Sequence, residues 1–126
     1  MYQIEKINDS AFYIKAIGTF PISVTESFVQ DFSDIIKDID RDLSVIIDIT
    51  DAIFLKLESI EPLVKLLQRN NKKLYRSAFV ISKNPPLAEE FRYILERADS
   101  PKRKIVDSLD EAKKWIGIED IVFQKK

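Results

Sequence analysis

The chain has 126 residues, of which 45% are hydrophobic and 33% are charged, and this size and composition are typical of one globular domain. It contains no cysteine and no histidine, which excludes disulfides, thiolate nucleophiles, cysteine-type zinc sites and histidine general bases. No apolar run approaches the roughly 20 residues that span a bilayer, and the start lacks a signal-peptide pattern. We therefore expect a cytoplasmic protein without a membrane span.

The first elements should be a β-hairpin and a helix. Strands are predicted over residues 2–7 and 12–17, and the Asn8-Asp9-Ser10 segment between them is typical of a turn. Ser23 and Glu26 have the spacing of a capping box, which predicts that a helix starts at Ser23. Its buried face should carry apolar residues that recur every three or four positions, namely Phe28, Phe32, Ile35, Ile36 and Ile39.

Strands and helices should alternate through the middle of the chain. Residues 43–50 form a nearly continuous β-branched run, which is typical of a strand covered on both faces. Pro62 requires that the next helix begin within about one turn before it, with Ser59 as the N-cap. A second buried strand is predicted over 77–82, and Asn84 should start the third helix.

The C-terminal part predicts a last strand and a capped helix. The strand should cover residues 104–107, and Ser108 and Glu111 form a second capping box. The helix that follows should end at Gly117, which is the residue type favoured just beyond a helix C-terminus. Trp115 lies on this helix and is expected in the core.

The predicted order ββαβαβαβα defines the fold class as α/β. It implies a single domain with one mixed, mostly parallel sheet of about five strands and about four helices. We place this domain at residues 1–117 and a C-terminal tail at 118–126. Two arrangements of the tail stay open, packing on the sheet or on a neighbouring chain, so a homodimer stays open as well.

Charge is distributed unevenly along the chain. Residues 26–61 carry ten acids and three bases, whereas residues 62–84 carry six bases and no acid. This segregation indicates either solvated helix faces of opposite sign, or head-to-tail association or the recognition of an acidic partner. The basic residues available for such recognition are Lys65, Arg69, Lys72, Lys73 and Arg76. The low isoelectric point, about 5.6, argues against nucleic-acid binding.

Asp48 and Asp51 are candidate functional acids, because ligands of α/β folds bind near the C-terminal ends of parallel strands. The alternative is structural, with Asp51 in a turn and Asp48 satisfied by backbone N–H groups. No catalytic set is recognisable, so we assign no catalytic residue and expect no enzyme. The acids of residues 38–42 lack the glycine and glutamate of a calcium loop, and no glycine-rich phosphate loop exists. We therefore assign no metal and no cofactor.

Three segments resemble the STAS-like domains typified by anti-sigma-factor antagonists, and among these the SpoIIAA-like group. Residues 45–54 are similar to the central strand of that family, residues 76–81 to its next strand, and residues 105–116 to its closing strand and capped helix. The resemblance covers nearly the whole chain. It implies a bacterial, non-enzymatic regulatory module that acts by protein–protein interaction.

The chain departs from the family at the phosphorylation motif. In phosphorylated antagonists an aspartate-serine-serine-glycine motif follows the central strand, and a partner kinase phosphorylates a serine there. Alignment on Phe54 places Leu57 or Glu58 at the acceptor position, and the nearest hydroxyl is that of Ser59. The resemblance therefore implies a module without the usual phosphoserine switch, in which Glu58 supplies a built-in negative charge. An offset of one residue would instead make Ser59 the phosphorylation site.

The predicted partner- or ligand-binding surface is the loop from Thr50 to Ser59. Its candidate residues are Asp48, Thr50, Asp51, Glu58 and Ser59. The alternative function, implied by the similarity of SpoIIAA-like domains to lipid-carrying domains, is a carrier or sensor of a small apolar, lipid-like ligand held between helices and sheet. Such a ligand would contact residues that would equally line an ordinary core, namely Leu63, Leu66, Leu67, Leu87, Phe91 and Leu95.

Overall fold

The computed structural model describes residues 1–81 and 85–118. Its elements follow the predicted order. The strands are β1 (Tyr2–Asn8), β2 (Ala11–Phe20), β3 (Leu43–Leu55), β4 (Leu74–Val80) and β5 (Arg103–Val106). The helices are α1 (Ile22–Ile36), α2 (Leu57–Asn70), α3 (Pro85–Ala98) and α4 (Leu109–Ile116).

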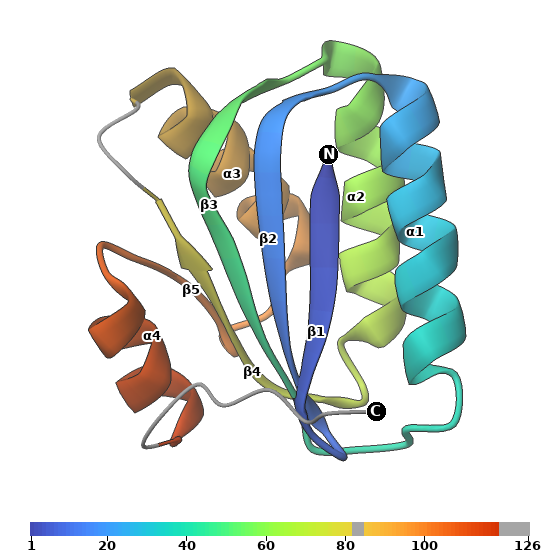
Figure 1. The fold of residues 1–126 in the computed structure, drawn as a ribbon, viewed down its shortest axis with the longest axis vertical. Coiled ribbons are helices and arrows are strands. Elements are labelled where there is room, and N and C mark those ends of the chain that lie inside the picture. Colours follow the sequence, from blue (N-terminus) through green and yellow to red (C-terminus); the bar gives the residue numbers. More distant parts are fainter. Residues whose placement is uncertain (82–84, 119–126) are drawn as a thin grey trace.

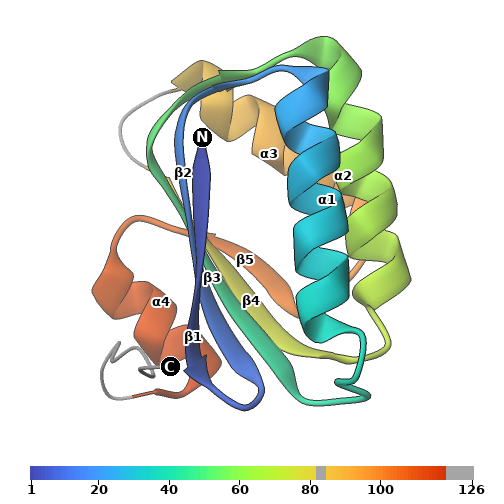
Figure 2. The same ribbon diagram turned by 45° about the vertical axis from the view of Figure 1, so that its right-hand side comes forward.

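The five strands form one sheet in the order β1-β2-β3-β4-β5. The hairpin of β1 and β2 is antiparallel, and the other neighbouring strands are parallel. Helices α1, α2 and α3 cover one face of the sheet, and α4 lies on the other face (Figures 1 and 2). The predicted mixed, mostly parallel α/β sheet is confirmed. In the described part of the chain, no helix is long and apolar enough to cross a membrane.

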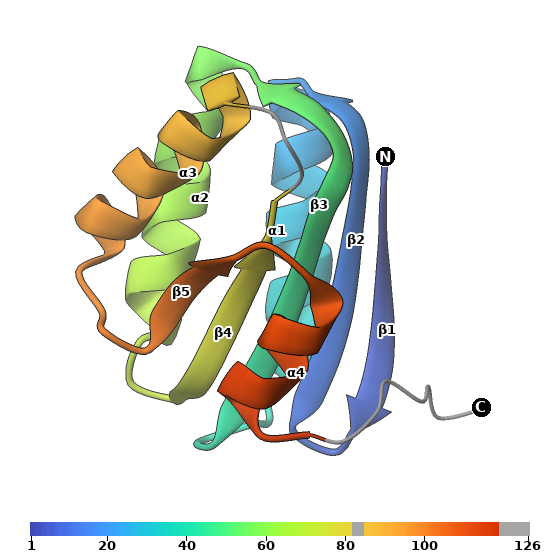
Figure 3. The ribbon, with the colours of Figure 1, turned by 90° about the vertical axis from the view of Figure 1, so that its left-hand side faces the viewer.

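Buried side chains on both faces explain the β-branched run of β3. Val45 and Ile49 pack toward the three-helix layer, whereas Ile46 between them packs toward α4 with Ala112. Such alternation requires apolar residues at successive positions, because neighbouring strand residues point to opposite faces. The other face of the central strand therefore needs α4, which Figure 3 shows lying across β3 and β4.

Two of the predicted helix starts are wrong. Helix α1 begins at Ile22 with Pro21 as N-cap, and no side chain of the described residues caps it. Proline suits a helix start because it has no N–H to satisfy and its φ is already restricted. Helix α2 begins at Leu57 with Lys56 as N-cap, so Ser59 lies within the first turn and is not the N-cap.

Strand boundaries also differ from the prediction. β3 continues five residues past Thr50 to Leu55, and β4 begins earlier than predicted and ends at Val80. Beyond Asp48, which pairs with Val80, β3 pairs only with β2 among the described residues. The extension carries the chain to the start of α2 at one end of the helix layer (Figure 1).

The predicted ends of α4 are confirmed. The hydroxyl of Ser108 accepts a hydrogen bond from the backbone N–H of Glu111 at 3.2 Å, and Gly117 has a left-handed φ of 80°. Trp115 is half-buried rather than a full core residue, and its Nε1 donates to the carbonyl of Ser77 at 2.9 Å. The predicted helix start at Asn84 and tail residues 119–126 lie outside the described residues.

Candidate functional site: the β3–α2 corner and an apolar cavity

The structure separates the predicted site residues into two groups. Asp48, Thr50 and Asp51 lie on β3, whereas Glu58 and Ser59 lie in the first turn of α2. The first group belongs to a polar cluster on the sheet, and the second lies where β3 turns into α2. The two groups have different environments and are described separately.

Asp48 is a buried carboxylate with a full set of hydrogen bonds. It is 4% exposed, and it accepts bonds from the hydroxyl of Tyr13, from the hydroxyl of Thr50 at 2.6 Å and from the N–H of Thr50 at 3.1 Å. Burial opposes its ionisation, but these bonds and the charge of Lys15 hold the pKa of Asp48 below its ordinary value. The bonds to Thr50 brace β3 where its pairing with β2 is irregular. These hydrogen bonds support the structural interpretation of Asp48.

Asp51 is more exposed than Asp48 and forms an ion pair with Lys15 at 2.9 Å. The hydrogen bond to Asp51 raises the pKa of Lys15, and burial together with Asp48 raises the pKa of Tyr13. Both shifts stabilise the ordinary protonated forms of lysine and tyrosine. Among the described residues, no group of three or more carboxylates is placed to hold a metal ion.

Ser59 is completely buried and its hydroxyl is already engaged. Its Oγ donates to the carbonyl of Phe20 at 2.8 Å and accepts from Oγ1 of Thr25 at 2.9 Å. The residue therefore joins α2 to α1 and to the end of β2. Sequence reasoning missed Thr25, although its position three residues before Phe28 places it on the buried face of α1.

The turn from β3 into α2 exposes apolar side chains. Leu57 is 86% exposed and Ile53 is 54% exposed, and the exposed Glu58 follows in the first turn of α2. We call these three residues the β3–α2 corner. A carboxylate is favourable in this position because a helix N-terminus carries partial positive charge. The corner is held in place by Glu90 of α3, which accepts a hydrogen bond from the N–H of Leu55 at 3.0 Å.

An apolar cavity of about 80 Å³ lies between the sheet and helices α1, α2 and α3. Of the predicted ligand contacts, Leu63, Leu66, Leu67 and Phe91 line it. Leu87 and Leu95 are not among its lining residues and pack in the adjoining core cluster. At about 24 cal/mol per Å³, a void of this size lowers the free energy of unfolding by about 2 kcal/mol.

Arg103 lies at the cavity and carries its charge into a largely apolar environment. Its guanidinium donates to the carbonyl of Leu67 at 2.9 Å, to Oδ1 of Asn71 at 3.2 Å and to Oγ of Ser77 at 3.3 Å. All three acceptors are neutral. Burial lowers the pKa of Arg103 to about 10, because desolvation penalises the charged form.

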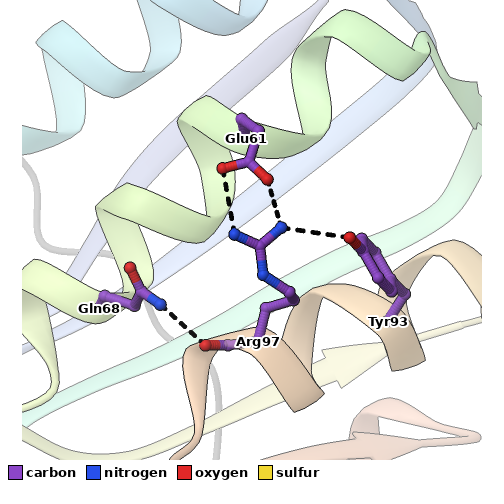
Figure 4. Close-up of polar contacts among 4 residues, drawn as sticks. All are labelled: Glu61, Gln68, Tyr93 and Arg97. Atoms are coloured by element: carbon purple, nitrogen blue, oxygen red, sulfur yellow. Dashed lines mark hydrogen bonds and ion pairs between the residues drawn. The ribbon is translucent and has the colours of Figure 1, made fainter.

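Polar contacts on the outer side of the helix layer join α2 to α3 (Figure 4). Arg97 of α3 forms two hydrogen bonds to the carboxylate of Glu61 on α2 and a third to the hydroxyl of Tyr93. Nε2 of Gln68 donates to the carbonyl of Arg97 at 2.8 Å. These exposed contacts hold together two helices that wall the cavity.

Part of the basic segment 62–84 has a structural role. Nζ of Lys73 donates to the carbonyl of Ile36 at 3.2 Å, at the C-terminus of α1, where positive charge is favourable. Arg76 stacks on the ring of Trp115 at 4.3 Å from its centroid and donates to its carbonyl at 2.9 Å. These two bases serve intramolecular contacts, which favours the structural interpretation for them.

No protein-family model matches this sequence, and no curated protein matches it. Solved structures do match it over nearly its whole length. A protein from the DUF3478 family of Shewanella loihica PV-4, described as having a SpoIIAA-like fold, is similar with a TM-score of 0.69 and 20% identity, over 92% of each chain. The chain has a SpoIIAA-like fold.

Two further structures of this fold are described as anti-sigma factor antagonists. The protein from Mycobacterium paratuberculosis is similar with a TM-score of 0.69 and 14% identity, over 93% of each chain. SpoIIAA in its unphosphorylated form is similar with a TM-score of 0.66 and 11% identity, over 95% of this chain and all of the other. The predicted STAS-like, SpoIIAA-like fold is thereby confirmed.

Proposed function

We propose that this chain is a non-enzymatic regulatory module that binds a protein partner through the β3–α2 corner and does not use a phosphoserine switch. The observation that carries the proposal is the contrast between two neighbouring side chains. Leu57 is 86% exposed, whereas the hydroxyl of Ser59 is buried and hydrogen-bonded. Exposed apolar side chains at a helix start favour partner binding, because docking removes their surface from water.

The SpoIIAA-like fold supports a regulatory role, since two proteins of similar structure are described as anti-sigma factor antagonists. Glu58 lies where the resemblance to phosphorylated antagonists places the acceptor region. We propose that its carboxylate supplies permanently a negative charge that those proteins gain by phosphorylation. The partner should therefore offer an apolar pocket for Leu57 with a basic group beside it.

The test is the purification of the tagged chain from its own source, followed by native and then denaturing mass spectrometry. Wild type is expected to carry a protein partner and no phosphate on Ser59, and Leu57→Asp should lose that partner. Ile35→Asp is the matched control, because Ile35 is an exposed apolar residue near the opposite end of the helix layer. Loss of the partner in both variants, or in neither, would refute a role for the corner.

Glu58→Gln tests the built-in charge separately. The change keeps the size of the side chain and removes its charge, so it should weaken partner binding without changing the fold. Unchanged affinity would refute the role of the charge and leave the apolar contact of Leu57 in place. The same native spectra report whether the chain is a homodimer.

A second candidate function is the binding of a small apolar ligand, and the cavity of about 80 Å³ favours it. Native interiors contain few voids larger than a water molecule, so a void of this size is unusual in a small domain. A ligand that fills it would recover contacts that the lining side chains otherwise lack. Release of a lipid-sized mass on denaturation would support this function.

A further inference from the structure

We infer that the cavity binds an aliphatic monocarboxylate, whose chain lies between sheet and helices and whose carboxylate pairs with Arg103. The inference rests on the second candidate function, the binding of an apolar ligand, and names the chemical class of that ligand. Two observations carry it independently. One is an apolar void, and the other is a partly buried cation on its lining whose hydrogen-bond acceptors are all neutral.

The void has the character of a site for an aliphatic chain. It is lined almost entirely by apolar side chains from the sheet and from three helices, among them Ile47, Leu66 and Phe91. About 10–15 Å³ is enough room for one water molecule, but water needs polar partners, and cavities lined by leucine, isoleucine and phenylalanine stay dry. The favoured occupant of about 80 Å³ is therefore a hydrocarbon group.

The lining has few polar side chains, and the charged one is Arg103. Among the described residues, the ion pairs involve other cations, so no carboxylate there neutralises this guanidinium. Buried charges in proteins are ordinarily paired, because an uncompensated charge is costly to desolvate. A ligand carboxylate would supply the missing charge.

The hydrogen bonds of Arg103 to the described residues use only some of its N–H groups. Nε, Nη1 and Nη2 each make one bond to a neutral acceptor of the described residues. A guanidinium has five N–H groups, so one N–H on each terminal nitrogen is left for the paired contact that carboxylates make with arginine. Asn70 also lines the cavity.

The size of the cavity determines how the hydrocarbon chain of the ligand would enter. The cavity holds only a short hydrocarbon segment as it stands, so a longer chain requires α2 and α3 to move apart. On the outer side these helices are joined by the exposed contacts of Glu61 and Arg97, and exposed ion pairs contribute little to stability. A medium-length chain is therefore the appropriate probe.

The experiment measures the binding of decanoate and of decanol to the full chain by isothermal titration calorimetry at pH 7.5. Wild type should bind decanoate at least about tenfold more tightly than decanol, because the alcohol leaves the guanidinium without an anion. Arg103→Gln keeps an amide donor but removes the charge, so it should abolish this preference. Arg103→Lys, which keeps the charge, should retain part of it.

Ala52→Leu provides a control that does not depend on Arg103. Ala52 lines the cavity, so the larger side chain should weaken the binding of both ligands. If Arg103→Gln fails to fold, the preference of wild type for decanoate and the weaker binding of both ligands by Ala52→Leu still test the inference.

Each outcome separates the inference from the functions proposed above. Equal affinities of wild type for decanoate and decanol would overturn the carboxylate inference and support an apolar ligand site. Absence of binding by either ligand would overturn both the carboxylate inference and the second candidate function. The partner retained by Ile35→Asp and lost by Leu57→Asp tests the β3–α2 corner alone.

Discussion

The hydroxyl of Thr25 donates a hydrogen bond of 2.9 Å to the hydroxyl of Ser59, and both side chains are completely buried. Ser59 in turn donates to the carbonyl of Phe20, so a short chain of bonds joins α1, α2 and the end of β2. The nearest hydroxyl to the family's phosphorylation motif thus connects three elements inside the molecule. A phosphate on Ser59 would require these elements to separate.

Removal of this hydroxyl should destabilise the fold. Ser59→Ala leaves the carbonyl of Phe20 without its donor in a buried site, so we expect the free energy of unfolding to fall by about 1–3 kcal/mol. Urea denaturation followed by circular dichroism measures the change. Ser23→Ala is the control, because the exposed Ser23 does not cap α1, and its effect should stay within about 0.5 kcal/mol. Equal losses in the two variants would contradict the structural role of Ser59.

Asp48 should make stability depend on pH at the acidic end. Its pKa in the folded chain is below the ordinary value of about 3.9, so the unfolded chain binds the proton more readily. The stabilisation is therefore complete above about pH 5 and is lost as the pH falls through the folded pKa. Asp48→Asn should lower the free energy of unfolding by about 1–3 kcal/mol at pH 7, and the difference from wild type should shrink toward pH 3.

Asp51→Asn is the matched control for that titration. Asp51 forms an exposed ion pair with Lys15, so its loss should cost no more than about 1 kcal/mol. Urea denaturation at several pH values measures both variants. If Asp51→Asn reduces the pH dependence of stability more than Asp48→Asn does, the buried carboxylate is not the group that couples stability to pH.

Replacement of an alanine by leucine should have opposite effects on stability on the two faces of the sheet. Ala52→Leu places a larger side chain in the cavity and should raise the free energy of unfolding by about 0.5–1 kcal/mol. Ala78→Leu enlarges a fully buried residue in the cluster beneath α4, and overpacking there should lower it by about 1–3 kcal/mol. Thermal unfolding of the two variants measures the difference. Destabilisation of similar size by both would indicate that the cavity cannot take the added atoms.

The contact between α2 and α3 should respond to salt. Glu61→Gln removes the carboxylate that Arg97 binds, so the melting temperature should fall at low ionic strength. The difference from wild type should be smaller in 1 M NaCl, because salt screens exposed charges. Calorimetry at two salt concentrations measures this. A difference that persists unchanged in high salt would show that the pair acts through packing rather than charge.

Periodicity and turn residues predicted the helices and strands. The residues at which these elements begin and end depend on contacts with neighbouring elements. The run at 43–50 predicted the buried strand, yet the bonds of Asp48 to Thr50 brace an irregular stretch, and the strand continues to Leu55. Ser108 capped α4 as predicted, because the cap is a local interaction. Ser59 did not cap α2, because burial against Phe20 and Thr25 engages its hydroxyl.

The candidate site was harder to predict than the fold. The exposure of Leu57 depends on where α2 begins. An error of a few residues in that boundary is enough to prevent the prediction of its exposure. The void among apolar residues depends on how α1, α2 and α3 pack together on the sheet, which single residues do not encode. Arg103 was not singled out, because a basic residue at the start of a strand has no local signal for burial.

Trp115 is the chain's only tryptophan, and it lies with α4 on the face of the sheet opposite the cavity. Its indole is covered by Arg76 and hydrogen-bonded to Ser77, so its emission should report whether α4 stays docked. Intrinsic fluorescence would therefore follow the detachment of that helix and remain insensitive to movement of the three-helix layer. The signal of an extrinsic dye on the other face, recorded beside it, would tell whether the two layers of this domain loosen together or one at a time.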